Sequence, residues 1–346
     1  MNPSTAVRAL SASVCLAAGM CANHASADAV NAFFPAPAAD RWMYPFNSTP
    51  GTRPVISTFG SDFSAPEFDN RDGQMLLRFD TTAQVTAGQG AGNYHVTRAV
   101  LTIQVATDQA FVYDDSQDPW QSFLPATDPD VQPDPDAGQP VECFGVGFRN
   151  GWTAASFQEN TAYAPAGTNV LQQSVRNAYA AGFQGGALVD VSNNVRQRFD
   201  PHPWGVGTIS TVAPGSLVPA GSLMTFELDV TNADIQGYLA QALDSGRLHL
   251  AVTSLTKVEM MAGQFPTFYA RENALVPLGL AQAAQLELDV SVGPACQPAD
   301  LDCSGVVDGT DLGLLLGAWS TSGPGDLDGS GVVDGTDLGL LLGSWG

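Results

Sequence analysis

Basic residues are scarce in this chain of 346 residues. Lys and Arg together number 13 against 35 Asp and Glu, the formal net charge is −22, and Lys257 is the only lysine. Nucleic-acid binding needs a basic surface that meets the phosphates, and adsorption to anionic lipid needs clustered cations. The charge therefore argues against a nucleic-acid partner and against an anionic membrane surface.

Long apolar runs are also missing beyond the N-terminal segment, so we expect no membrane-spanning helix. The N-terminal segment has Arg8, then an apolar stretch rich in small residues at 9–22, then an A-x-A sequence at 25–27. This pattern is typical of a signal peptide, residues 1–27, that is cleaved after Ala27. We therefore predict a protein that is secreted or displayed at the cell surface.

Cysteines are few, and two of the five, Cys15 and Cys21, fall inside the predicted signal peptide. The remaining Cys143, Cys296 and Cys303 allow at most one internal disulfide in an oxidising compartment. A bridge between Cys296 and Cys303 closes the shortest loop and is preferred, with a bridge from Cys143 to either of them as the alternative. No C-x-x-C motif is present and the histidines are far apart, so zinc is not indicated.

Charged residues make up only 14% of the chain, whereas Gly (36) and Pro (23) are abundant, a balance that favours strands and turns. Apolar residues alternate with other residues at 101–105, 144–148, 224–230 and 286–292. Such alternation buries one face of a strand and is typical of antiparallel sandwiches. We predict a mainly β fold for residues 28–293, a jelly roll or β-sandwich with one or two short helices.

One helix is predicted after residue 230. Thr231 or Asn232 can cap it, and Gly246 can end it. Its apolar stripe has helical spacing. The stripe consists of Ile235, Tyr238, Leu239, Ala242 and Leu243.

An acidic, proline-containing loop runs from Asp114 to Asp136 and holds seven aspartates. A solvated surface excursion is the simpler interpretation of such a charge run. A further cation site is the alternative, although the spacing matches no established ligand pattern.

The strongest feature is a repeat, because residues 300–319 and 326–345 are near-identical copies offset by 26 positions. Each copy contains D-x-D-x-S-G-x-x-D-x-x-D, the spacing of oxygen ligands in a twelve-residue calcium loop, with glycine at the sharp turn. The predicted ligands of the first loop are Asp300, Asp302, Ser304, the Val306 carbonyl, Asp308 and Asp311. Those of the second loop are Asp326, Asp328, Ser330, the Val332 carbonyl, Asp334 and Asp337.

Charge supports the same interpretation, since no Lys, Arg or His follows Arg271. Neighbouring aspartates repel one another by about 1–4 kcal/mol per pair, and a divalent cation relieves that repulsion. Hard oxygen ligands in a flexible loop favour Ca²⁺ over zinc, copper and magnesium. We therefore predict two Ca²⁺ ions, which contribute to the folding free energy of this segment.

A short apolar helix is expected after each loop. Leu312, Leu315, Leu316 and Trp319 lie on one helical stripe, and the second copy repeats the pattern. We expect the two stripes to bury each other with pseudo-twofold symmetry.

Residues 298–346 resemble a dockerin type I domain, a pair of calcium-binding, EF-hand-like loop-helix repeats found at the end of secreted, often polysaccharide-degrading proteins. Thr310 and Thr336 fall where that family often has a partner-contacting Ser-Thr pair. The basic residues that the family often carries after the second leucine are absent, and the connector 320–325 is too short for its usual middle helix. The resemblance implies calcium binding, and a cohesin-like partner, a cell-surface partner and an intramolecular attachment are alternatives.

The sandwich segment resembles, more loosely, the DNRLRE-type jelly-roll modules of secreted bacterial proteins. The similarity lies at 76–80, 99–103, 189–191 and the helix after Thr231. It implies a jelly roll associated with carbohydrate or cell-wall binding. The predicted organisation is a signal peptide at 1–27, the sandwich at 28–293, a linker at 294–299 and the calcium module at 300–346.

Established catalytic motifs are missing: we find no nucleophile elbow, HExxH, P-loop or dinucleotide fingerprint. Sugar-binding clefts use aromatic rings. Trp120, inside the acidic loop, and Trp152, after it, are the candidate ligand-binding residues, with ordinary packing as the alternative. We predict an exported, non-catalytic calcium-binding protein whose tail serves attachment or assembly and whose sandwich binds a polysaccharide or another surface polymer. The alternatives are a polysaccharide-degrading hydrolase or lyase and a structural cell-envelope protein.

Overall fold

The computed structural model describes residues 28–61, 65, 67–258, 264–293, 297–302, 305–323 and 325–346. The predicted signal peptide, the predicted ligand Ser304, and both cysteines of the preferred bridge, Cys296 and Cys303, lie outside these residues. The described chain forms two compact units, one within residues 28–293 and one within 297–346. Within these ranges, no helix has both the length and the apolar character needed to cross a bilayer.

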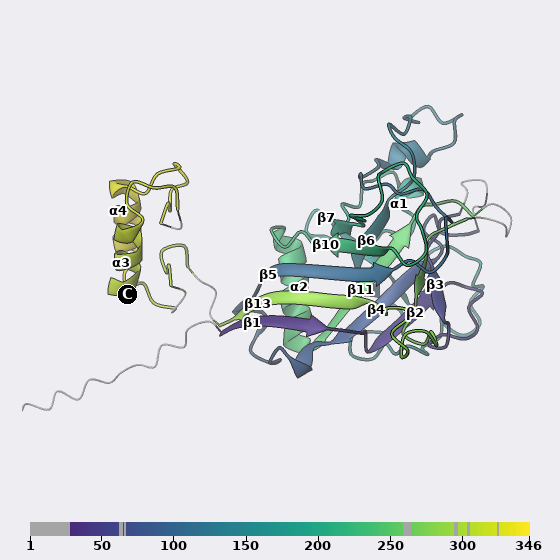
Figure 1. Cartoon of the computed structure of the whole chain (residues 1–346), viewed down its shortest axis with the longest axis horizontal. Coiled ribbons are helices and arrows are strands. Elements are labelled where there is room, and N and C mark those ends of the chain that lie inside the picture. Colours follow the sequence, from purple (N-terminus) through teal and green to yellow (C-terminus); the bar gives the residue numbers. More distant parts are fainter. Residues whose placement is uncertain are drawn as a thin grey trace, which may run out of the picture. The chain divides into compact units, whose positions relative to one another are not determined.

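Antiparallel sheets build the larger unit, which confirms the prediction of a mainly β, sandwich-like fold with few short helices (Figure 1). The four-stranded sheet has the order β1 (Asp28–Phe34), β13 (Gln285–Val292), β5 (Tyr94–Gln104) and β10 (Leu223–Glu227). The seven-stranded sheet has the order β2 (Ala39–Met43), β4 (Gln74–Asp80), β11 (Arg247–Ser254), β6 (Val141–Phe148), β7 (Ala178–Gln184) and β8 (Ala187–Asp190), with β9 (Gly205–Val206) beside β6. A separate pair consists of β12 (Thr267–Tyr269) and β3 (Val55–Ser57).

The predicted alternation holds in the four-stranded sheet. Leu286, Leu288 and Val290 of β13 are buried, and so are their neighbours Leu101 and Ile103 of β5. Their side chains form one core with the inner face of the seven-stranded sheet. Burial of each such side chain stabilises the fold by about 1.5–3 kcal/mol.

The prediction of one solvent-facing side fails for β6, in which every residue before Phe148 is buried. The reason is that aromatic rings cover the face of this strand on which its glycines lie. A Cβ on Gly145 would lie 2.2 Å from the ring of Trp204, and one on Gly147 would lie 2.4 Å from the ring of Tyr179. The two glycines therefore admit aromatic rings on the face that we expected to be solvated.

The predicted helix forms as α2 (Ala233–Ser245), capped by the Asn232 side chain and ended by Gly246 with φ of 75°. It runs across the strand direction (Figure 1), and two of its side chains form hydrogen bonds with the two sheets. Gln236 accepts a hydrogen bond from Val96 N of β5 and donates one to Val96 O, at the β-bulge of that strand. The Tyr238 hydroxyl donates to the carbonyl oxygen of His249 in β11.

The remaining helices are short. The larger unit has α1 (Asn194–Gln197) and 3₁₀ turns η1 (Thr81–Ala83), η2 (Ala91–Asn93) and η3 (Trp120–Phe123). The smaller unit has α3 (Gly309–Gly317) and α4 (Gly335–Gly343), one after each repeated loop.

Candidate functional site

Each repeated loop gathers three carboxylates at the start of its helix. One carboxylate oxygen each from Asp300, Asp302 and Asp311 lies within 4.8 Å of the other two. Asp326, Asp328 and Asp337 make the same arrangement in the second loop. These residues occupy positions one, three and twelve of the predicted calcium loops, so the fold brings carboxylate oxygens together where the spacing predicts them.

The sharp turn of each loop depends on glycine. Gly305 has φ of 87° and Gly331 has φ of 90°, a left-handed conformation that side chains with a Cβ disfavour. In this conformation Gly305 N donates to Asp300 Oδ2 at 2.7 Å, and Gly331 N donates to Asp326 Oδ2 at 2.7 Å. The backbone thereby orients the first carboxylate of each loop toward its centre.

Position twelve is buried and held by the backbone. Asp311 Oδ2 accepts from Asp308 N at 2.8 Å, and its Oδ1 accepts from Asp302 N at 3.1 Å. Burial alone would raise the pKa of Asp311, but these backbone hydrogen bonds outweigh it and hold the pKa below its ordinary value. The equivalent hydrogen bonds, led by that from Asp334, lower the pKa of Asp337. Both carboxylates are therefore ionised at neutral pH.

The other predicted ligands have different roles in the structure. Asp308 and Asp334 are the N-caps of α3 and α4, and each forms a capping box with the aspartate three residues later. The Ser330 hydroxyl donates to the Val332 carbonyl at 3.2 Å. Calcium ligation by all the predicted residues of both loops stays a prediction, and the structure adds that the three carboxylates of each triad lie close enough to hold a metal ion.

The core of the smaller unit differs from the expected one. Leu315 and Leu341 are buried together with Val307 and Val333 of the loops. Leu316, Trp319, Leu342 and Trp345, expected in the buried stripes, are instead 40–51% exposed. The loop valines take their place in the core, where the backbone is also paired: Ser320 N donates to Val333 O, and Gly346 N donates to Val307 O.

The two candidate ligand-binding tryptophans lie in different surroundings. Trp152 lines a cavity of about 440 Å³ together with Phe148, Tyr238, Arg247 and His249. Trp120 belongs to a small separate cluster around Phe123 and Leu124, with Arg198 over its ring at 5.5 Å.

His249 is one of the residues that line this cavity. The residue is 5% exposed, and its Nδ1 has no hydrogen-bond partner in the described part of the chain. Burial, followed by the charges of Arg78 and Arg247, lowers the pKa of His249 to about 3. The imidazole is therefore uncharged at neutral pH.

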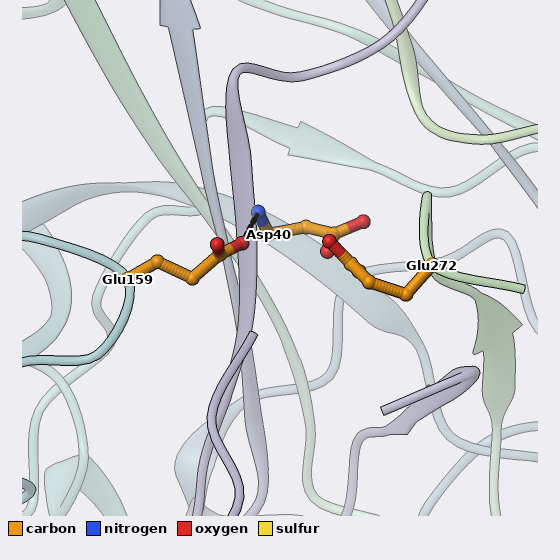
Figure 2. A group of neighbouring side chains, drawn as sticks. All are labelled: Asp40, Glu159 and Glu272. Carbon is orange, nitrogen blue, oxygen red and sulfur yellow. Dashed lines mark hydrogen bonds between the residues drawn. The ribbon is translucent and has the colours of Figure 1, made fainter. Parts of the chain in front are cut away.

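A third group of carboxylates, which the sequence did not reveal, lies in the sandwich. Glu159 and Glu272 approach Asp40 of β2 from opposite sides (Figure 2), and one oxygen of each lies within 4.8 Å of the others. Arg271 offsets part of this negative charge by pairing with Glu159 at 2.7 Å and Glu272 at 2.6 Å. We interpret the group as structural because this guanidinium occupies the position of a counter-ion.

Asp40 makes the stability of the sandwich depend on pH. Burial, then a hydrogen bond shared with Glu272, raises its pKa from 3.8 to about 8, against the opposing charge of Arg271. The folded state therefore binds a proton more tightly, and this stabilisation is lost as pH rises from about 4 to about 8. Loss of the Asp40 proton makes the free energy of unfolding fall by up to about 1.4 kcal/mol per pH unit over that range. We expect Asp40→Asn to remove this dependence, as measured by urea unfolding at several pH values.

Asp108→Asn is the matched control for that measurement. Asp108 is exposed and accepts a hydrogen bond from a backbone amide, Ala220 N, as Asp40 does from Arg271 N. The interpretation is wrong if both variants keep the pH profile of the native protein.

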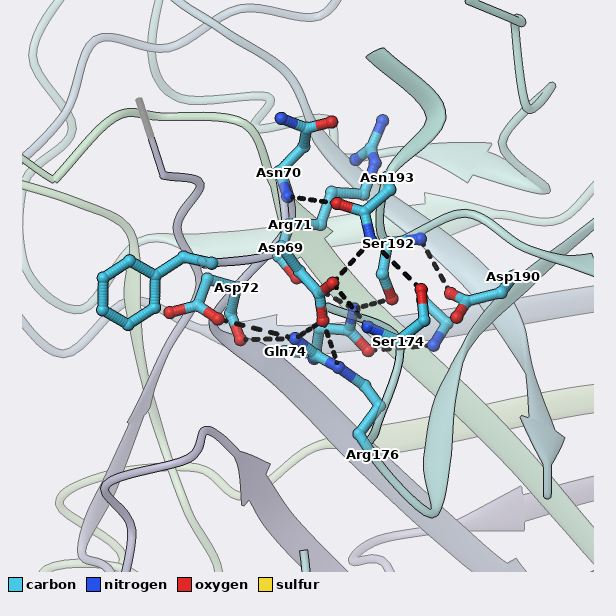
Figure 3. Close-up of polar contacts among 12 residues, drawn as sticks. Asp69, Asn70, Arg71, Asp72, Gln74, Ser174, Arg176, Asp190, Ser192 and Asn193 are labelled. Carbon is cyan, nitrogen blue, oxygen red and sulfur yellow. Dashed lines mark hydrogen bonds and ion pairs between the residues drawn. The ribbon is translucent and has the colours of Figure 1, made fainter. Parts of the chain in front are cut away.

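A buried polar network ties together β4, β7 and the segment 190–194 (Figure 3). Asp69 accepts from Arg176 through Nε at 3.0 Å and Nη2 at 2.6 Å, and it also accepts from Ser174 N at 3.0 Å. Gln74 of β4 donates to Ser192 Oγ at 2.8 Å and accepts from Ala180 N of β7 at 2.9 Å. Nearly all of these side chains are inaccessible to solvent, so we interpret the network as one that positions the loops.

Cys143, the first of the three cysteines after the predicted signal peptide, is buried in β6 and forms no disulfide. Burial raises the pKa of its thiol, which makes the thiol unreactive. The alternative bridges from Cys143 are therefore not present, whereas the Cys296–Cys303 bridge stays a prediction.

Comparison with protein-family models gave no match, and comparison with curated proteins gave no significant relative.

Proposed function

We propose that this is an exported calcium-binding protein in which the C-terminal module mediates attachment and the sandwich binds carbohydrate. The observation that carries the calcium part is the duplicated triad of carboxylates, each beside a glycine turn at the start of a helix. Two equivalent loops with the same ligand positions support one Ca²⁺ ion in each.

Attachment is supported by the apolar surface of the same module. Leu316, Trp319, Leu342 and Trp345 are each 40% or more exposed, two from each repeat. Exposed aromatic and aliphatic groups of this kind are typical of surfaces that contact another protein. A cohesin-like protein or a cell-surface protein would meet this surface, and the dockerin type I resemblance supports the former.

Carbohydrate binding is supported by the cavity around Trp152. An indole ring beside Arg247, Gln241 and Thr153 offers an apolar platform with polar groups at its edge, the combination that sugar rings need. None of the described residues that line the cavity is Asp or Glu. Glycoside hydrolysis needs a pair of carboxyl groups, so the lining supports binding at this cavity over cleavage.

A jelly-roll relationship is the finer fold inference. Consecutive strands cross between the two sheets at β4, β5 and β6 and again at β10 and β11. Such crossing supports the resemblance to DNRLRE-type modules, whose association with cell-wall polymers agrees with the proposed ligand class.

The test of the carbohydrate proposal replaces Trp152 with Ala. Loss of a ring that a sugar covers removes about 1.5–3 kcal/mol, so we expect affinity for the bound polysaccharide to fall at least about tenfold. Affinity electrophoresis against a panel of cell-wall polysaccharides measures this change. Trp120→Ala is the matched control, because that ring packs outside the cavity and its loss is expected to leave affinity unchanged.

Three outcomes would redirect the proposal. Equal loss in both variants would point to general destabilisation. Release of reducing sugar by the native protein would favour the hydrolase alternative. Failure to bind any polysaccharide, combined with multimerisation in calcium, would favour a structural envelope role.

A further inference from the structure

The acidic loop between β5 and β6 departs from the solvated excursion expected of it. Asp114 is 4% exposed and Asp118 is 7% exposed. The chain beside them is fixed to the sandwich, because Tyr113 N donates to Ser216 O at 2.8 Å and Val112 bridges to Leu217. Two carboxylates of the loop are therefore held in place below the surface.

Only one oxygen of each of these two carboxylates accepts a hydrogen bond from the described part of the chain. Asp114 Oδ1 accepts from Ser116 N at 2.8 Å, and Asp118 Oδ1 accepts from the Ser116 hydroxyl at 3.4 Å. The Oδ2 atoms of both residues are buried, and neither has a hydrogen-bond partner within the described residues. Leaving a buried carboxylate oxygen without a partner costs several kcal/mol, so these atoms need a partner that the described residues do not supply: a cation, a proton or a water molecule.

A third carboxylate completes a cluster. Asp136, at the far end of the loop, is exposed and brings an oxygen within 4.8 Å of oxygens from Asp114 and Asp118. The close approach is built into the backbone, because a Cβ on Gly138, which has φ of 120°, would lie 2.9 Å from Cβ of Asp114.

Elsewhere in the sandwich, buried carboxylates have arginine partners. Arg176 pairs with Asp69 and Asp72, and Arg71 pairs with Glu142. Among the described residues, no ion pair includes Asp114, Asp118 or Asp136. The basic side chain of the same region, Arg198, pairs instead with Asp128 and Asp130.

We propose that Asp114, Asp118 and Asp136 form a third divalent-cation site, in the sandwich and independent of the C-terminal loops. An all-oxygen, all-carboxylate donor set selects a hard cation, and the exposed side at Asp136 leaves room for the water ligands that Ca²⁺ takes. Because Asp114 and Asp136 lie at the two ends of the loop, the ion would close that loop on the sandwich in place of a disulfide.

The test counts the calcium ions bound by the full chain, by equilibrium dialysis after treatment with chelator. We expect three ions for the native chain and two for Asp114→Asn/Asp118→Asn. Asp302→Asn/Asp328→Asn, which disables the C-terminal loops, is expected to retain one. The matched control, Asp128→Asn/Asp130→Asn, removes the same charge from the same loop and is expected to bind three.

A second measurement keeps the test decisive if the first variant folds poorly. In the Asp302→Asn/Asp328→Asn background, calcium is expected to raise the unfolding temperature of the sandwich and to protect residues 114–136 from proteolysis. The proposal is wrong if that variant binds no calcium, or if Asp114→Asn/Asp118→Asn binds as many ions as the native chain. Either result would show that a partner other than a cation satisfies the two buried oxygens.

Discussion

Calcium chelation is expected to abolish amide-exchange protection in α3 and α4 while leaving β5, β11 and β13 protected. The smaller unit buries few apolar side chains, chiefly Leu315, Leu341, Val307 and Val333, and it concentrates eight aspartates without one basic residue. An ion present at a thousand times its Kd contributes about 4 kcal/mol per site to folding, enough to decide whether so small a core forms. Hydrogen exchange of the full chain in calcium and in chelator measures this effect.

Asp300→Asn/Asp326→Asn is expected to mimic chelation even in calcium. Asn can still accept the hydrogen bonds from Gly305 N and Gly331 N, so the substitution removes charge while retaining the hydrogen-bonding capacity of the turn. Asp308→Asn/Asp334→Asn is the matched comparison, because Asn caps a helix as well as Asp and the same charge is removed. We expect the first pair to lose protection fully and the second to lose it in part. Unchanged protection in chelator would contradict the account.

Arg176→Met is expected to be the most damaging single substitution in the sandwich network. Arg176 and Asp69 are both buried, and Arg176 also donates to Asp72 O at 3.2 Å (Figure 3). Removing one partner of a buried ion pair leaves the other charge uncompensated and typically costs about 3–5 kcal/mol. Urea unfolding in the presence of calcium measures this loss.

Arg98→Met is the control for that substitution. Arg98 pairs with Glu287 at 2.8 Å, and both side chains are more than 40% exposed. Exposed pairs of this kind contribute at most about 1 kcal/mol, so little loss of stability is expected. A similar small loss for Arg176→Met would show that the network is not the support for the loops that we infer.

The sequence predicted a strand, a helix cap and a glycine turn correctly, because each depends on only a few neighbouring residues. The alternation at 286–292, the cap at Asn232 and the glycine at 305 each reflect a preference that a few neighbouring residues fix. The repeat placed the carboxylates of each loop because loop spacing alone brings positions one, three and twelve together.

Other features could not be predicted because distant segments create them. Trp204 covers β6 from more than fifty residues away, so alternation within β6 could not reveal that both faces are buried. Asp40, Glu159 and Glu272 come from three unrelated loops and strands. The core of the smaller unit uses Val307 and Val333 of the loops and leaves Trp319 and Trp345 exposed, which helical periodicity does not report.

The central claim is that the two repeated loops each bind one calcium ion. Calorimetric titration of calcium into the Asp114→Asn/Asp118→Asn variant tests it most directly, because that variant lacks the site proposed in the sandwich. The account predicts uptake of two ions per chain, reduced to none when Asp302→Asn and Asp328→Asn are added. Absence of binding heat in the first variant, or unchanged uptake after the added substitutions, would contradict it.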